Sequence, residues 1–406
     1  MTELDEIVQS FMRPPYPYDP YPLYAQLRDA APLYRADDGF WYASSYEAAT
    51  AVFRSPHLGQ GSGPDSRIRR DPRFDDSSAL QTLAYMLPFI DPPDHTRLRQ
   101  LISRAFTPRA VERMRTFLAG HVDALLDAMA ANGGGDVMSE LADHIPVAVI
   151  CEMLGAPGDR HRDLVGWADA LVAAVHPTVS DEHLAHADNG ASAFRAYVDT
   201  LIEQRRREPR DDLLTALVQA EADGDSLDGL ELTSTVCVFI GAGIENTKHY
   251  IGACIAWLLR DREQLERLQH DPSLQASAFE EVLRLEPPVQ VAVPRLVLED
   301  TELLGSTLRK GEHVCPLVGA ANRDPRAYAG PDVFDVSRVG PPNLSLASGA
   351  HYCTGAGLAR LEASVAAGRF LERFPNARLV TDPPVRDDIR PSLRGYASLT
   401  VDLGAS

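Results

Sequence analysis

The segment from Leu230 to Leu268 constrains the fold more than any other part of the sequence. Asp228 and Glu231, three residues apart, form the pattern of a capping box, and a long apolar run follows. At 1.5 Å per residue, thirty helical residues extend about 45 Å, which is enough to cross a whole molecule of this size. The first half of the segment is apolar all round, which predicts burial on every side. The rest of the chain must therefore enclose this helix.

The middle of the predicted helix carries residues that stability does not explain. Gly241–Gly243 lacks large side chains, and the polar trio Glu245–Thr247 follows directly. Each interior glycine costs about 1 kcal/mol relative to alanine, and a buried carboxylate costs more unless it is partnered. Missing side chains let a flat molecule approach the helix beside the polar trio. The alternative is a helix crossing that the glycines permit, with Glu245 paired to Lys248 on the surface.

The remaining sequence predicts a mainly helical protein with small β-sheets. Helical periodicity runs from about residue 95 to 285, whereas strand-like segments lie near both ends, at residues 32–44, 291–303, 312–318 and 398–403. The chain contains no internal repeat and no long linker. We therefore expect an α+β fold in which residues 1–406 form a single domain.

Composition excludes several classes of partner. The net charge of −19 repels phosphate backbones and anionic lipid, so we expect neither nucleic acid nor membrane surfaces to bind. The N-terminus lacks the pattern of a signal peptide, and no run of eighteen apolar residues occurs. Cysteines are too few and too widely spaced for a disulfide framework, and no CxxC pair offers a zinc site. A cytoplasmic location is expected.

One cysteine has a distinctive context. A loop containing Gly349 precedes Cys353, Gly355 follows it, and an amphipathic helix begins near Gly357. At a helix N-terminus the macrodipole and free N–H groups favour a thiolate. The two glycines remove side chains where a large ring could lie against the backbone. Although an arbitrary cysteine is more often a small buried hydrophobe, this loop and helix favour a metal ligand.

At this point the chain resembles the bacterial cytochrome P-450 monooxygenases. Their signature Phe-Gly-x-Gly-x-His-x-Cys-x-Gly corresponds to residues 346–355, and the following LARLEA matches the usual continuation. Further landmarks appear in the family's order, at residues 19–35, 91–99, 279–288, 321–325 and 334–338. The resemblance covers essentially the whole chain. It implies the cytochrome P-450 fold, with the long central helix over the haem.

The resemblance implies roles for individual residues. Cys353 is implied as the axial iron ligand of heme b (iron protoporphyrin IX), with Gly349 in the cofactor-binding loop. Two buried propionates need cationic or N–H partners. The positions that match the family's propionate ligands are His95, Arg99, Arg295 and His351. A structural ion network is implied for Glu281, Arg284 and Arg338.

Three departures from the family pattern qualify this interpretation. Leu346 and Ala347 replace the signature's phenylalanine and glycine, which changes the surroundings of the thiolate. Gly357 stands where proline is common. In the central helix, Asn246 follows Glu245 where the family has a threonine that assists proton delivery, and Thr247 lies about 100° further round the helix. Asparagine has no hydroxyl proton to relay, so it either orients a water or a substrate group, or the reaction has changed.

The predicted reaction inserts one oxygen atom from dioxygen into a small organic substrate, by hydroxylation or epoxidation. A tailoring step in bacterial secondary metabolism is expected by analogy. The alternatives are an atypical oxidation such as oxidative coupling, a substrate tethered to a carrier protein, and a non-catalytic haem-binding protein. Residues 59–78 and 176–189 are expected to gate entry. The catalytic set is Glu245, Asn246 and Thr247, and the pocket residues are Val238, Gly241, Ala242, Val291, Ala292 and Tyr396.

Electrons must come from another protein, because no flavin or second nucleotide-binding unit fits within this length. A ferredoxin with its ferredoxin reductase is the expected donor, and the enzyme is expected to be a monomer. Docking is predicted at a local basic patch of Arg104, Arg109, Arg113 and Arg360.

Overall fold

The computed structural model describes residues 2–61, 66, 68–156, 160–174, 179–222, 227–387 and 392–404. Two compact units divide the chain. Unit 1 consists of Met1–Leu58, Arg115–Ile145 and Asn246–Ser406, and unit 2 consists of Gly59–Met114 and Pro146–Glu245. Within the described residues, no helix is both long enough and apolar enough to cross a membrane.

The largest sheet of unit 1 joins strands from both ends of the sequence. β1 (Leu33–Arg35) pairs antiparallel with β2 (Phe40–Ala43), and β2 runs parallel to β8 (His313–Pro316). β5 (Arg295–Val297) is antiparallel to β8, and β3 (Leu58–Gly59) completes the sheet order β1-β2-β8-β5-β3. The strand-like pattern at residues 32–44, 291–303 and 312–318 is therefore confirmed.

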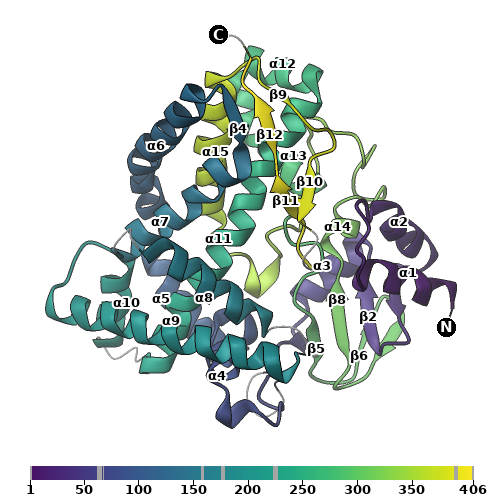
Figure 1. The fold of residues 1–406 in the computed structure, drawn as a ribbon. Helices are drawn as coiled ribbons and strands as arrows, with labels where there is room; N and C mark the ends of the chain where they lie inside the picture. Colours follow the sequence, from purple (N-terminus) through teal and green to yellow (C-terminus); the bar gives the residue numbers. More distant parts are fainter. Residues whose placement is uncertain are drawn as a thin grey trace. The chain divides into compact units, whose positions relative to one another are not determined.

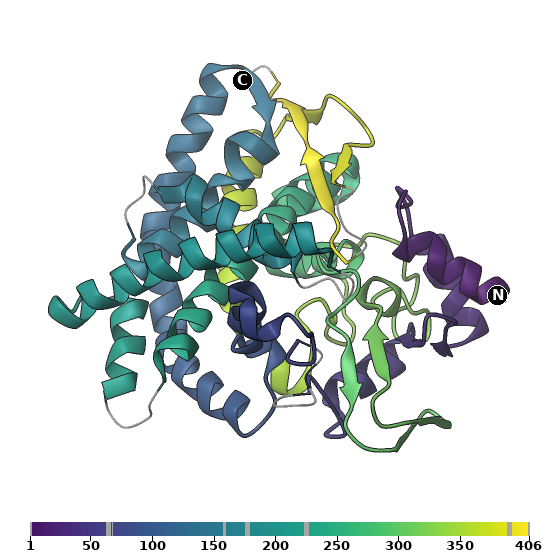
Figure 2. The ribbon, with the colours of Figure 1, turned by 60° about the horizontal axis from the view of Figure 1, so that its bottom comes forward.

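The N-terminal helices supply the core beside this sheet. α1 (Glu3–Met12) and α2 (Tyr21–Ala30) lie next to it, as the purple and green ribbons of Figures 1 and 2 show. Their apolar faces bury Phe11, Tyr24 and Leu27 together with Leu317, just after β8. Burying large apolar side chains stabilises the folded state by about 1.5–3 kcal/mol each.

Smaller sheets and helices complete unit 1. β4 (Gly134–Asp136), β12 (Thr400–Asp402) and β9 (Arg378–Leu379) form one sheet, and β6 (Thr301–Leu303) pairs with β7 (Ser306–Leu308). β10 (Val385–Asp387) and β11 (Gly395–Ser398) form an antiparallel pair. A π-helical stretch spans Met138–Ala142. The helices are α3 (Tyr46–Arg54), α12 (Arg262–His270), α13 (Gln275–Leu285), α14 (Val318–Ala321) and α15 (Ala356–Arg373), with 3₁₀ turns at Pro272–Leu274 and Gly349–His351.

Unit 2 is helical. α9 (Asp181–Arg207) is its longest complete helix, and Ser180 caps its N-terminus. Arg205–Arg207 lie in its last turn, where their positive charges interact favourably with the negative end of the helix dipole. α8 (His161–Ala173) and α4 (Ser78–Ala84) both pack on α9. The other elements are α5 (Asp94–Ala105), α10 (Leu213–Ala222) and 3₁₀ turns at Phe74–Asp76 and Leu87–Phe89.

Three helices contain a boundary between the units, namely α6 (Pro108–Ala131), α7 (His144–Leu154) and α11 (Gly229–Arg260). The predicted capping box of α11 is confirmed, because Asp228 accepts from the Glu231 amide at 2.8 Å and Glu231 accepts from the Asp228 amide at 3.0 Å. The predicted end at Leu268 is wrong. Asp261 accepts from the Gln264 amide at 3.1 Å and so starts a new helix, α12.

Candidate functional site

The loop before Cys353 is built from backbone hydrogen bonds. The Ala347 amide donates to the Leu344 carbonyl, and the Cys353 amide donates to the Leu346 carbonyl, both at 2.9 Å. The next helix, α15, begins at Ala356, with Gly355 as its N-cap. The loop therefore presents Cys353 just before a helix N-terminus, as predicted from the sequence.

Cys353 differs from the other cysteines, all five of which lie within the described residues. The other four are buried, whereas Cys353 is half-buried. Burial raises the pKa of the Cys151 thiol to about 11, and it also raises the pKa of Cys237 and Cys254. Buried thiols of this kind are inert, so Cys353 is the cysteine best placed for chemistry.

The two glycines that flank Cys353 have different roles. A side chain on Gly355 would meet no atom within 4 Å, so the structure leaves open space there. Gly349 has a φ of +73°, and a Cβ would lie 2.6 Å from the Phe53 carbonyl oxygen at the end of α3. Of these two glycines, only Gly355 has the open space that the sequence analysis expected beside a large ring. At Gly349 the missing side chain makes room for the end of α3 instead.

Ala347 adopts a conformation that suits glycine. Its φ is +59°, in the left-handed region that residues with a Cβ rarely occupy. Such a conformation costs a residue with a Cβ about 1–2 kcal/mol. The departure from the signature at this position is therefore a source of local strain.

The predicted ion network beside this loop is confirmed. Arg284 donates through Nε and Nη2 to both carboxylate oxygens of Glu281, at 2.7 and 2.8 Å. Arg338 Nε adds a third bond to Glu281 at 2.7 Å. Since Glu281 and Arg284 are each about 2% exposed, this network fixes the surrounding chain rather than meeting a ligand.

Four other predicted site residues belong to unit 1. Arg295 is buried at the start of β5, and His351 is half-buried in the turn Gly349–His351. Asn246 is half-buried and Thr247 is buried on α11. Lys248 is the next residue, and its Nζ lies 3.4 Å from a carboxylate oxygen of Asp143. It therefore pairs with a carboxylate other than that of Glu245.

The predicted pocket residues of unit 1 differ in exposure. Val291 belongs to the buried core beside Leu317, and Tyr396 is 1% exposed. Ala292 is half-buried, as is Leu393, three residues before Tyr396. Ala292 and Leu393 therefore present more surface than Val291 and Tyr396, whose place in a pocket wall stays a prediction.

Unit 2 contains the remaining predicted cofactor ligands. His95 and Arg99 lie four residues apart on α5, so they share one face of the helix. His95 is 2% exposed and Arg99 is half-buried. Their assignment to the haem propionates stays a prediction.

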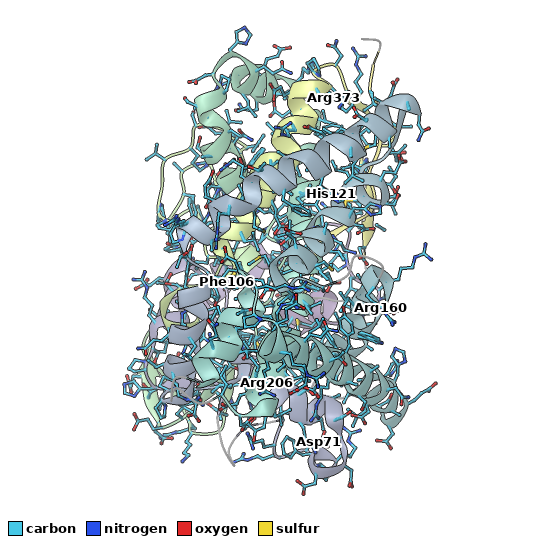
Figure 3. The ribbon with its side chains drawn as sticks, turned by 90° about the vertical axis from the view of Figure 1, so that its left-hand side faces the viewer. Asp71, Phe106, His121, Arg160, Arg206 and Arg373 are labelled. Atoms are coloured by element: carbon cyan, nitrogen blue, oxygen red, sulfur yellow. The ribbon has the colours of Figure 1, made fainter. Side chains whose placement is uncertain are left out.

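The unit 2 part of α11 has an accessible stretch in an otherwise buried helix. Ala242 is exposed, and Val238, Gly241 and Glu245 are half-buried, whereas residues 232–237 are all buried. A Cβ on Gly243 would lie 3.2 Å from Ile150. Gly243 therefore lies in a helix contact, as the alternative interpretation expects, while the approach of a flat molecule beside the exposed Ala242 stays a prediction. Phe106, labelled in Figure 3, packs against Phe239 of α11 with 5.0 Å between ring centres.

The predicted gates and the docking patch are only partly described. Residues 62–65, 67 and 176–178 lie outside the described residues, and so does the side chain of Arg104. From Asp181 the second gate is the start of α9 rather than a loop. In the docking patch Arg109 is exposed, but Arg113 pairs with Asp211 and Arg360 with Glu280.

Sequence reasoning missed one buried cluster. Glu286 binds Arg386 and Arg394, which lie 100 and 108 residues further along the chain. No periodic pattern links residues so far apart, and the only signal was a glutamate directly after a buried helix.

Comparisons with known proteins show the family of this chain. The family described as cytochrome P450 matches residues 57–274 and 272–387. The chain is 37% identical over 377 residues to cytochrome P450 107B1 of Saccharopolyspora erythraea, which covers 90% of this chain and 89% of the relative. It is 34% identical to the epothilone C/D epoxidase of Sorangium cellulosum, over 97% of this chain and 94% of that enzyme.

A solved structure is similar over nearly the whole length. P450BioI in complex with acyl carrier protein ligated to hexadec-9Z-enoic acid has a TM-score of 0.87 and 33% identity, covering 95% of this chain and 98% of that one. The mainly helical architecture with small sheets, expected from the sequence, is thereby confirmed.

Proposed function

Because the chain belongs to the cytochrome P450 family, whose members bind haem b, we propose that Cys353 supplies the axial thiolate in a monooxygenase. The residues around Cys353 fit the cofactor. Its side chain is half-buried, and open space adjoins Gly355. This half-buried cysteine at the start of α15 is the observation that carries the proposal.

When bound, haem supplies the activation of dioxygen, and a thiolate ligand favours cleavage of the O–O bond. The polypeptide positions the substrate, excludes water and delivers protons. His95, Arg99, Arg295 and His351 would donate to the two haem propionates, with Gly349 shaping the loop. Charge-assisted hydrogen bonds of this kind offset the cost of burying carboxylates.

The test of the axial ligand is spectroscopic. Reduced wild-type protein with carbon monoxide should show the absorption of thiolate-ligated haem, and Cys353→Ala should lose it. Cys151→Ala is the matched control, since that buried thiol is inert and its loss should leave the spectrum unchanged. Protein that stays colourless after haem supplementation, or a Cys353→Ala variant with an unaltered spectrum, would overturn the proposal.

Proton delivery is assigned to Glu245, Asn246 and Thr247 on α11. Glu245 is half-buried, so its carboxylate can exchange protons with water, and the Asn246 amide can both donate and accept. In this proposal Asn246 orients a water or a polar group of the substrate. The rival proposal is an oxidative coupling that does not need a hydroxyl relay.

The ratio of product formed to reduced nicotinamide consumed distinguishes these two proposals. Asn246→Ala should lower that ratio if Asn246 orients the proton donor, whereas Asn246→Thr, which restores the family's residue, should preserve it. An unchanged ratio in Asn246→Ala would remove Asn246 from proton delivery and favour the coupling reaction.

The substrate is proposed to be a small, mainly apolar organic molecule of bacterial secondary metabolism. The epothilone C/D epoxidase is one relative whose name fits such a role. Val238, Gly241 and Ala242 would line the pocket from α11, where the helix is accessible. The other assigned residues are Val291, Ala292 and Tyr396. A screen for compounds that shift the haem absorption of the purified protein tests this assignment.

A substrate tethered to a carrier protein is the second candidate. It is favoured by the similarity to P450BioI, whose structure contains an acyl carrier protein with its fatty acid. Titration with a free fatty acid and with the same acid on a carrier protein distinguishes the two. Tighter binding of the carrier-linked acid would support tethering, and equal binding would exclude a role for the carrier.

A ferredoxin with its ferredoxin reductase is the proposed electron donor, and we place the enzyme in the cytoplasm as a monomeric single domain. None of the five cysteines, all within the described residues, forms a disulfide, which suits a reducing compartment. Reconstitution with a surrogate ferredoxin and reductase tests the donor. Sedimentation of the purified protein tests the monomer.

A further inference from the structure

Glu286 forms the centre of a buried ion cluster in unit 1. It follows the last residue of α13 and is 2% exposed. Arg386 of β10 donates to its two carboxylate oxygens at 3.1 and 3.0 Å, and Arg394 Nε donates at 2.5 Å. Trp257 Nε1 adds a bond at 3.3 Å. One carboxylate therefore joins helix α13 to both sides of the β10–β11 pair.

The cluster holds its charges firmly. Burial alone would raise the pKa of Glu286, but Arg386 and Arg394 outweigh it and lower that pKa to about 2. Aromatic rings flank the guanidinium groups: Arg386 lies 4.4 Å from the ring centre of Tyr396, and Arg394 lies 5.3 Å from that of Tyr21. Such contacts orient a guanidinium as well as stabilising it.

The backbone after Glu286 is fixed on both sides. On one side the Arg394 amide donates to the Pro288 carbonyl and the Gln290 amide to the Ser392 carbonyl, both at 2.8 Å. On the other side the Ala292 amide donates to the Pro316 carbonyl at 3.0 Å. Residues 288–292 therefore lie as a middle strand between residues 392–394 and the end of β8.

Val289 and Leu393 form an accessible apolar part of this strand pair. They are directly opposite one another in an antiparallel bridge, so their side chains share one face. Both are half-buried, whereas Pro288 and Gln290 are buried. The pair thus exposes apolar surface close to the predicted pocket residues. Val289 lies two residues before Val291, and Leu393 lies three residues before Tyr396.

We propose that Glu286 is a positioning residue that sets the substrate wall formed by Val289 and Leu393. The inference rests on the proposed function, since it assumes that this strand pair borders the haem pocket. Glu286 acts through Arg394, whose backbone closes the bridge at Pro288, and through Arg386 on the neighbouring strand. Displacing either arginine moves Leu393 relative to Val289.

Two haem ligands of different size test this role in the holoenzyme. Imidazole needs only the iron, whereas the phenyl group of 4-phenylimidazole also needs an apolar wall. In Glu286→Gln, imidazole affinity should stay unchanged while 4-phenylimidazole binds about tenfold more weakly, the size of coupling seen between residues in one network. Leu393→Ala, which alters the wall directly and leaves the cluster intact, should show the same selective loss. Glu286→Asp should recover part of it.

Hydrogen exchange supplies a readout that does not involve ligands. The amides of Gln290 and Arg394 should exchange faster in Glu286→Gln, because their bonds join the two wall segments. The matched control is Asp212→Asn, which removes the buried carboxylate bound to Arg205 in unit 2. That variant should lose stability without changing the ratio of the two affinities.

The outcomes separate this inference from the proposed function. If wild-type protein shows the thiolate-ligated spectrum but Glu286→Gln and Leu393→Ala keep the wild-type affinity ratio, Glu286 has no positioning role and the proposed function stands. If 4-phenylimidazole binding falls equally in Asp212→Asn, the effect is general destabilisation and the inference fails. A wild-type protein without haem would remove the proposed function itself.

Discussion

Arg284 and Glu281, one helical turn apart on α13, are joined by two hydrogen bonds of 2.7 and 2.8 Å in a part of the molecule where both side chains are about 2% exposed. Two parallel bonds of this kind fix direction as well as distance. Arg284 Nη1 also donates to the Asn322 and Pro331 carbonyls, and Arg338 Nε shares the same carboxylate. The network therefore connects α13 to the chain that leads toward the cysteine loop.

Glu281→Gln should lower the free energy of unfolding by about 3–5 kcal/mol, because removing one partner leaves buried guanidinium charge uncompensated. Glu203→Gln is the control, since Glu203 pairs with Arg206 on the surface of α9, where the loss should be below about 1 kcal/mol. Urea denaturation of both variants measures the difference. Equal losses would show that burial of the Glu281 pair adds nothing.

Ala347→Gly should stabilise the cysteine loop. At a φ of +59° alanine is strained by about 1–2 kcal/mol, and glycine relieves this while losing more freedom on folding, so a net gain of about 0.5–1 kcal/mol is expected. The control is Ala363→Gly in the buried interior of α15, which should cost about 1 kcal/mol or more. Shifts of the denaturation midpoint in opposite directions would bear this out, whereas a loss in both variants would contradict it.

The sequence predicted those features that depend on neighbouring residues. The capping box of Asp228 and Glu231 and the position of Cys353 before α15 are encoded within a few residues, and both appear in the structure. The end of α11 was missed because apolar periodicity continues past Asp261, and only the cap formed by that side chain breaks the helix. A local pattern cannot distinguish one bent helix from two.

Contacts between distant residues explain the other differences. The close neighbour of Gly349 is Phe53, nearly 300 residues earlier in the chain, and Glu286 binds arginines at least 100 residues away. No local pattern encodes these distances, so the sequence analysis assigned Gly349 to ring clearance and left Glu286 without a role. The exposure of Leu393 likewise depends on its pairing with Val289.

Two buried glutamates should give the stability of the protein opposite pH dependences. Burial raises the pKa of Glu362 on α15 well above its usual value, whereas that of Glu286 is lowered to about 2. The pKa of glutamate in the unfolded chain is about 4.3. The stability contributed by protonated Glu362 is therefore lost as pH rises above about 4.3 and through the raised pKa of the folded state. The stability contributed by ionised Glu286 is lost as pH falls below about 4.3 toward 2.

Glu362→Gln should therefore reduce the loss of stability as pH rises above about 4.3, and Glu286→Gln should instead weaken the acid dependence. Denaturation midpoints measured from acid pH, below about 4.3, to alkaline pH show both effects. If Glu362→Gln leaves the alkaline slope unchanged, its carboxyl does not stay protonated in the folded state.

A set of hydrogen bonds in unit 2 joins α4 and its preceding turn to the start of α9. Arg73 Nη1 lies 2.7 Å from Asp181, and its other side binds Asp71, which Figure 3 labels. Asp188 accepts from the Ser77 hydroxyl at 2.6 Å and from the Ala79 amide at 2.9 Å. The two segments expected to gate the pocket are thus joined to each other. As gates, they would have to separate or move together when a ligand enters.

Weakening this connection should speed both entry and exit of a ligand. Asp188→Ala and Arg73→Gln should raise the association and dissociation rate constants of 4-phenylimidazole by about three- to tenfold, since one or two bonds of about 1 kcal/mol each are lost from the closed state. The equilibrium affinity should change less than either rate. Stopped-flow absorption measures these constants, and Glu203→Gln on the same helix is the control, because its bond to Arg206 stays within α9. Rates in Asp188→Ala that match those of the control would show that separation of α4 from α9 does not limit entry.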